Sequence, residues 1–272
     1  MTEPADVASG TAQNRFRAGT FAPAPAPASL IRMLAAQTRM ELTLLLRNGE
    51  QLLLTMFIPI TLLIGLSILP IDTGAGDTAA DRATTFVPAI LAVAIMSTAF
   101  TGQAIAVGFD RRYGALKRLG ATPIPRWGII AGKSAAVVLV VALQSLIIGG
   151  IGLAFGWRPS ATGLALGVIL IALGTIAFST LGLLLGGTLK AEVVLALANL
   201  VWFVLLALAS LTVFDEHVPA AVHWVARCSP SGALTEALRM ALDSSVDLFG
   251  IGVLVAWSVI GGALAVRWFR FE

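Results

Sequence analysis

The sequence predicts an all-α polytopic membrane protein with six transmembrane helices. Hydrophobic residues make up 57% of the 272 residues and charged residues only 12%, whereas a soluble domain carries about 25% charged residues. The apolar residues are also gathered into long blocks, and the mean hydropathy is +0.90. An ordinary soluble fold is therefore excluded.

Six apolar blocks are long enough to cross a bilayer, because a spanning helix needs about 20 residues for a hydrocarbon core of about 30 Å. They contain no Asp or Glu, and Lys133 is their one basic residue. Their sequences lack the alternating pattern of a membrane β-barrel, so helices are the remaining way to satisfy the backbone in lipid. The predicted spans are approximately 51–69, 84–108, 129–156, 163–188, 193–213 and 248–266.

The placement of basic residues predicts the orientation, since cytoplasmic loops carry an excess of Lys and Arg. With both termini in the cytoplasm, the outer side receives only four of the 18 basic residues: Arg82, Arg158, Arg227 and Arg239. The basic residues are mostly arginine, which favours a GC-rich bacterial source. We expect a multi-pass protein of a bacterial plasma membrane with both termini inside.

The chain is expected to form one membrane domain over residues 29–272, preceded by a tail. Residues 1–28 are polar and then rich in Ala and Pro. Such a composition is typical of disordered backbone because it cannot bury a core.

Residues 29–47 predict an amphipathic helix that lies on the membrane surface before the first span. Its basic side carries Arg32, Arg39 and Arg47, while Gln37 and Glu41 interrupt its apolar side. The helix either anchors the chain to anionic lipid or also contacts a partner protein.

The loop between the second and third spans predicts a short charged helix followed by a break. Asp110 to Leu119 can form about three helical turns, and Gly120 suits the helix end. Thr122 followed by Pro123 has the character of an N-cap and a first helical residue for the next helix. By composition alone, an ordinary positively charged inner loop is the competing interpretation.

Residues 214–247 are too polar to span and predict two short helices on the outer surface, at Val218–Cys228 and Ser231–Leu242. His217 and His223 are six residues apart, which is not the i, i+4 spacing that places two ligands on one helix face. We expect them to be surface histidines and expect no metal site.

Several chemistries are excluded by missing residues. The single cysteine, Cys228, rules out sites that need several thiolates. Gly128–Ser134 resembles a phosphate-binding loop, but it lacks the correct glycine spacing and a preceding strand, so the chain has no ATP site of its own. The spans hold no acid or histidine, which argues against ion-driven transport. No nucleophile lies near a base, so catalytic residues are not expected, and nothing indicates a nucleic-acid partner.

Small and polar residues inside the spans have two interpretations each. Glycine pairs predict close helix packing, within one subunit or at a dimer seam; the pairs are Gly163 with Gly167 and Gly182 with Gly186. Polar and aromatic side chains at mid-membrane depth can line a pathway for an amphipathic substrate or can hydrogen-bond between helices; they are Gln103, Gln144, Asn199 and Trp202.

The loop between the second and third spans also carries a longer pattern, in which an acidic residue and two arginines precede Gly, Leu-Lys, Leu and Thr-Pro. In this chain the pattern consists of Asp110, Arg111, Arg112, Gly114, Leu116, Lys117, Leu119, Thr122 and Pro123, with Gly132-Lys133 at the head of the next span. It resembles the type-2 family of ABC transporter membrane permeases, in particular the drug and antibiotic exporter branch that includes daunorubicin-exporter permeases. The resemblance covers about residues 30–272, although Asp110 stands where the family often has Glu.

The resemblance implies that this loop is a coupling helix seated in a groove of a separate ATPase subunit, and that the N-terminal amphipathic helix lies on the same subunit. It further implies two ATPase copies, which hold ATP and Mg, and a second permease that is identical or paralogous. This chain would hold no cofactor. The substrate would be a hydrophobic small molecule or a lipid.

Two other functions remain open at this point. The same architecture can export a lipid or glycan building block, and a membrane scaffold or regulatory subunit would not transport at all. An ATPase that copurifies with the chain would favour the transporter functions over the scaffold.

Overall fold

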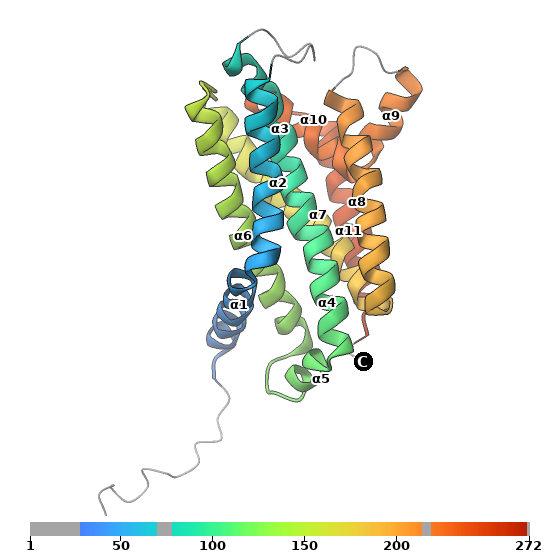
Figure 1. Cartoon of the computed structure of the whole chain (residues 1–272). Helices are drawn as coiled ribbons and strands as arrows, with labels where there is room; N and C mark the ends of the chain where they lie inside the picture. Colours follow the sequence, from blue (N-terminus) through green and yellow to red (C-terminus); the bar gives the residue numbers. More distant parts are fainter. Residues whose placement is uncertain (1–27, 70–77, 214–218, 271–272) are drawn as a thin grey trace, which may run out of the picture.

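The computed structural model describes residues 28–69, 78–213 and 219–270, and in these ranges every regular element is a helix. In chain order the elements are α1 (Leu30–Arg47), α2 (Gly49–Ile68), α3 (Ala79–Ile95), the π-helix η1 (Met96–Gly102), α4 (Gln103–Arg112), α5 (Ala115–Gly120), α6 (Arg126–Ala154), α7 (Ala161–Thr188), α8 (Ala191–Val213), α9 (Ala220–Cys228), α10 (Pro230–Leu242) and α11 (Leu248–Trp268). The long helices form a bundle, with α1 at one end of it (Figure 1). The predicted disordered tail lies outside the described residues except for its last residue.

Five of the described helical segments are long and apolar enough to cross a membrane, which confirms a polytopic all-α membrane protein. One of them is Ala79–Arg112, where α3, η1 and α4 form a continuous helix, and the others are α6, α7, α8 and α11. In α2 a shorter apolar stretch, Thr55–Ile68, meets the composition expected of a span. The number of six spans therefore stays a prediction.

We distinguish the two ends of the bundle by the helices that lie there. We name them the α5 end, which carries α1, α5 and the end of α11 at the bottom of Figure 1, and the α9 end at the top. The continuous helix Ala79–Arg112 has 34 residues and is therefore about 50 Å long, which exceeds a hydrocarbon core of about 30 Å. Part of it therefore extends beyond a core of that thickness, and charged residues stand at both of its ends: Asp81 and Arg82 at one, Asp110, Arg111 and Arg112 at the other.

The π-helix η1 interrupts the second span, and polar side chains gather along it. Trp202 Nε1 donates to Ser97 Oγ at 3.0 Å, and Thr98 Oγ1 donates to Gln144 Oε1 at 2.9 Å. These hydrogen bonds join η1 to α8 and α6. Short π-helical turns within α-helices occur frequently at functional sites.

Glycines of α7 allow close packing within this one chain. A Cβ added at Gly182 would lie 2.8 Å from Phe100 O, and one added at Gly186 would overlap Ala104 O. A Cβ at Gly163 would likewise lie within 3.0 Å of backbone oxygens at the end of α10. Packing within one subunit, one of the two interpretations of these glycines, is confirmed.

The segment before the last span forms two helices at one end of the bundle, as predicted, and other helices of the chain enclose α10. Its N-terminus is capped by Ser229, whose Oγ accepts from Gly232 N at 3.1 Å, and Pro230 follows in the first turn. Nearly all its residues are buried, and it packs against α3, α7, α8 and α11. Small residues such as Ala233 and Ala237 permit this close approach.

Candidate functional site

The α5 end joins segments that are far apart in the sequence: α1, the turn from α4 through α5 to α6, and the end of α11 (Figure 1). A sharp turn at Gly114 separates α4 from α5. Gly114 has φ +69°, in the left-handed region that favours glycine. The predicted single helix from Asp110 to Leu119 is therefore wrong, because α4 ends at Arg112. The end of α5 at Gly120 agrees with the prediction.

The turn after α5 is closed by Thr122. Its Oγ1 donates to Leu119 O at 2.6 Å, so it satisfies a carbonyl at the end of α5. The next helix begins only at Arg126, after Pro125 with ψ 146°. The predicted roles of Thr122 as N-cap and Pro123 as first helical residue are wrong, because the chain makes an additional turn before α6 starts.

Leu116 packs α5 against the bundle. The residue is 1% exposed and belongs to an apolar cluster with Val107 of α4, Ile129 of α6 and Leu183 of α7. Full burial of a leucine side chain contributes about 1.5–3 kcal/mol. The position of α5 is thus fixed by packing, since a helix of six residues has little stability alone.

Asp110, the first residue of the loop pattern, contacts this chain itself. Lys133 Nζ lies 2.5 Å from Asp110 Oδ2 and 2.8 Å from Glu41 Oε2. Gln37 Nε2 donates to Glu41 Oε1 at 2.8 Å. The side chains of Lys133 and Glu41 are 9% and 7% exposed, and that of Asp110 is 34% exposed. The two residues that interrupt the apolar side of α1 are therefore the ones that face α6.

The two arginines of the pattern also bind within the chain. Arg111 Nη1 donates to Gly186 O at 3.0 Å and to Leu189 O at 2.9 Å. These carbonyls stand at the end of α7, where helical partners are lacking. Arg112 forms an ion pair with Glu192 in the first turn of α8. Together with Asp110, these residues hold the loop to α6, α7 and α8.

A second set of side chains points away from the bundle. We call it the α5 surface; it consists of Arg32, Arg39 and Arg47 on α1 and of Tyr113, Lys117, Arg118, Thr122, Pro123 and Trp127 around α5, all of them exposed. It combines five basic residues with two large aromatic rings. The arginines of α1 thus lie on its exposed side, as the amphipathic pattern predicts.

Phe269 and Arg270, which follow α11, also lie in this region, and the sequence did not predict this. Arg270 N donates to Gly187 O at 3.0 Å, and a Cβ at Gly187 would overlap the Phe269 ring. Next to α5 lies a cleft of about 690 Å³, which is lined by Leu116, Lys117, Gly120, Ala121, Arg126, Phe269 and Arg270. The aromatic and basic residues after the last apolar block were the available sequence signal.

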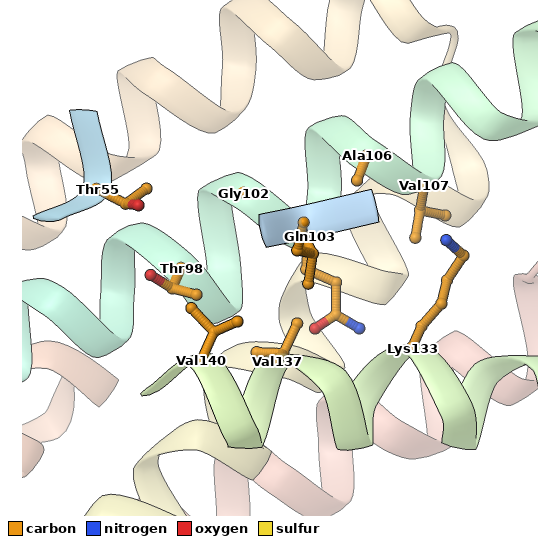
Figure 2. A pocket seen from close by; sticks show the side chains of 10 residues that line it. Thr55, Thr98, Gly102, Gln103, Ala106, Val107, Lys133, Val137 and Val140 are labelled. Carbon is orange, nitrogen blue, oxygen red and sulfur yellow. The ribbon is translucent and has the colours of Figure 1, made fainter. Parts of the chain in front are cut away.

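A small cavity lies deeper in the bundle, between α4 and α6. Figure 2 shows Gln103 pointing from α4 toward α6 and Lys133 pointing from α6 toward α4. The cavity has about 30 Å³, enough for about two water molecules. Ser179 Oγ donates to Gln103 Oε1 at 2.6 Å, whereas the buried Gln103 Nε2 has no hydrogen-bond partner among the described residues. Thr55, Thr98, Val107, Val137 and Val140 also line this space.

The structure does not bring the three predicted pathway residues together. Gln103 borders the cavity, and Trp202 is half-buried against η1. Asn199 is exposed, and its Nδ2 donates to Leu195 O of its own helix at 2.8 Å. Hydrogen bonding between helices accounts for the first two residues but not for Asn199.

In the part of the chain that the structure describes, three buried carboxylates lie outside the predicted spans, and each has a basic partner. Glu41, Glu236 and Asp247 are each 6% exposed; their partners are Lys133, Arg239 and Arg227, at 2.8, 2.8 and 2.6 Å. A buried charge is retained when it is paired in this way. Within the described residues, groups of three or more His, Cys, Asp and Glu that could hold a metal ion are not found; His217 lies outside them.

The family model described as ABC-2 type transporter matches residues 33–242. The matched range begins in α1, includes the whole turn around α5, and ends at the last residue of α10. A comparison with curated proteins finds no match.

Proposed function

Because the chain belongs to the ABC-2 type transporter family, we propose that it is the permease of an exporter that moves a hydrophobic or amphipathic compound, a drug or antibiotic, out of the cell. Family membership makes it a membrane component of an ABC transporter, which works together with an ATP-binding subunit. In the proposed complex that subunit is a separate chain, which holds ATP and Mg and hydrolyses the nucleotide.

The observation that carries this proposal is the division of the loop into inward and outward side chains. Asp110, Arg111 and Leu116 fix the loop to α4, α6 and α7. Tyr113 and Lys117 are exposed on the same turn. A force applied to this turn would therefore reach α4, α6 and α7 directly, as a coupling element requires.

The energy source in this proposal is the partner, because each buried carboxylate among the described residues already has a basic partner. These carboxylates are Glu41, Glu236 and Asp247. For ATP to drive transport, the ATP-bound partner must interact differently with two permease conformations, since only a differential interaction shifts their populations.

The cavity at Gln103 supports a substrate that is apolar with a hydrogen-bond acceptor. Valine side chains line part of the cavity, and the Gln103 amide offers a donor without a partner among the described residues. At about 30 Å³ it has room only for water-sized molecules, so the compound would enter in a conformation with α4 and α6 further apart.

The proposed assembly contains two permeases, identical or paralogous, and two ATPases. The positive-inside rule supports placing the α5 end and both termini in the cytoplasm of a bacterial cell. Lipid and the second permease would cover apolar side chains that are exposed here, such as Leu200 and Phe203 on α8.

The proposal is tested by substitution on the α5 surface. We expect Tyr113→Ala combined with Lys117→Glu to insert normally but to retain several-fold less ATPase when the permease is purified from its native membrane. Both side chains are exposed, so the loss would reflect docking. The matched control is Leu248→Ala, an exposed apolar residue at the α9 end. Failure of the unaltered chain to copurify with any ATPase would contradict the proposal and favour a scaffold.

A lipid or glycan building block is the second candidate substrate. A deletion strain screened against many toxic compounds separates the two: drug export predicts increased sensitivity to amphipathic compounds, whereas lipid or glycan export predicts a changed cell envelope.

A further inference from the structure

Lys133 joins three separate elements through charge. Its Nζ contacts Glu41 of α1 at 2.8 Å and Asp110 of α4 at 2.5 Å, while Lys133 itself belongs to α6. Lys133 and Glu41 are almost fully buried. Buried charges are costly unless they are paired and hydrogen-bonded, so this arrangement strongly favours one relative position of the three helices. We call Glu41, Asp110 and Lys133 the ionic clasp.

The contact between α1 and α6 around the clasp is unusually close. A Cβ at Gly132 would overlap the side chain of Gln37, whose amide donates to Glu41 at 2.8 Å. Glycine at this position thus lets α1 approach α6, and Gln37 fixes the rotamer of the Glu41 carboxylate. On this side the clasp holds the amphipathic helix.

Asp110, the second acidic residue of the clasp, lies close to α5 in the chain. Asp110 stands in the last turn of α4, just before the turn at Gly114. Leu116 of α5 packs against Ile129, which lies one helical turn before Lys133 on the same face of α6. The clasp and the Leu116 contact therefore form one continuous strip along α6.

We propose that the ionic clasp fixes α1 and α5 in one relative position, so that the two parts of the α5 surface dock on the ATPase and move as one body. Lys133 is the central positioning residue of this unit. The inference rests on the proposed function for the identity of the partner, but the fixed position of α1 relative to α5 is a property of this chain alone.

The first test measures the distance between α1 and α5 in the full chain in nanodiscs, without any ATPase. Spin labels are attached at Arg39→Cys and Lys117→Cys in a Cys228→Ser background, since both label positions are exposed. We expect one narrow distance distribution in this background and with Lys133→Arg, which keeps the charge. Lys133→Met, of similar length but without charge, should broaden the distribution.

A triple variant separates positioning from folding. Lys133→Met alone leaves two carboxylates without their partner and is expected to lower the thermal midpoint. Adding Glu41→Gln and Asp110→Asn removes the uncompensated charges, which should restore much of the midpoint while the distance distribution stays broad. A narrow distribution in the triple variant would overturn the clasp, because α1 and α5 would then be positioned without it.

The second test uses the complex purified from native membrane. We expect the triple variant to retain several-fold less ATPase than the unaltered chain. The single variant Lys133→Arg, which keeps the charge, should retain as much ATPase as the unaltered chain. Unchanged ATPase retention despite a broad distribution would overturn the role of the clasp in docking. Absence of an ATPase from the unaltered complex would instead contradict the proposed function, and the distance measurement would still decide whether the clasp positions α1 and α5.

Discussion

Individual residues of the loop pattern differ in what they contact, although they are adjacent in the sequence. Asp110 and Arg111 are turned into the bundle, and Leu116 is buried in an apolar cluster. Tyr113 and Lys117, between and beside them, are exposed. A sequence pattern shows which residues belong together, but the direction of each side chain depends on the left-handed turn at Gly114.

The two arginines of the pattern allow a test at the scale of single residues. We expect Arg111→Ala to lower the free energy of unfolding by about 1.5–3 kcal/mol, since a charged donor to two carbonyls at the end of α7 is lost. Arg112→Ala is the control and should cost about 0–1 kcal/mol, because its ion pair with Glu192 is exposed. Thermal unfolding of the purified protein in detergent compares the two variants. Equal losses would contradict these contacts.

The polar residues of α1 show what residue patterns miss. Gln37 and Glu41 look like faults in an apolar face when the helix is considered alone. Gln37 donates to Glu41, and Glu41 pairs with Lys133, which is far away in the sequence and there resembles the lysine of an imperfect phosphate loop. The pairing at 2.8 Å explains both irregularities together, but it could not be predicted without knowing that α1 crosses α6.

At the scale of elements, composition predicts where each helix begins and ends in the sequence, but it does not predict how deeply the helix is buried in the bundle. The predicted and observed ranges of the long helices agree closely because apolar block length sets helix length in a membrane. The pattern of α10 predicted a short helix at the outer surface but did not show that four other helices pack around it. Its small residues and the glycine-rich face of α7 make this packing possible.

The burial of α10 gives a prediction for this element. Leu234 is fully buried, so Leu234→Ala should lower the free energy of unfolding by about 2–5 kcal/mol. Val225→Ala on α9 is the control, with an expected change within about 0.5 kcal/mol because Val225 is exposed. Chemical or thermal unfolding in detergent measures both. A small effect of Leu234→Ala would mean that α10 lies on the surface.

For the whole molecule, the basic residues separate between the two ends, and this predicts the orientation. The native Cys228 is exposed at the α9 end, whereas Lys117 lies at the α5 end. A membrane-impermeant thiol reagent should label Cys228 in intact cells. In a Cys228→Ser/Lys117→Cys variant, labelling should require permeabilised cells. Labelling of the second variant in intact cells would reverse the orientation.

The sequence by itself determined the membrane location, the helical class, the approximate helix ranges and the loop pattern, because long apolar blocks admit few alternatives in lipid. The resemblance in that pattern agrees with the ABC-2 family match over residues 33–242. Only the tertiary structure decided that Asp110 and Glu41 share Lys133, that α10 is buried and that Gln103 faces a cavity. These features depend on contacts between distant segments, whose close approach is set by small residues such as Gly132 and Gly186 and is invisible in local periodicity.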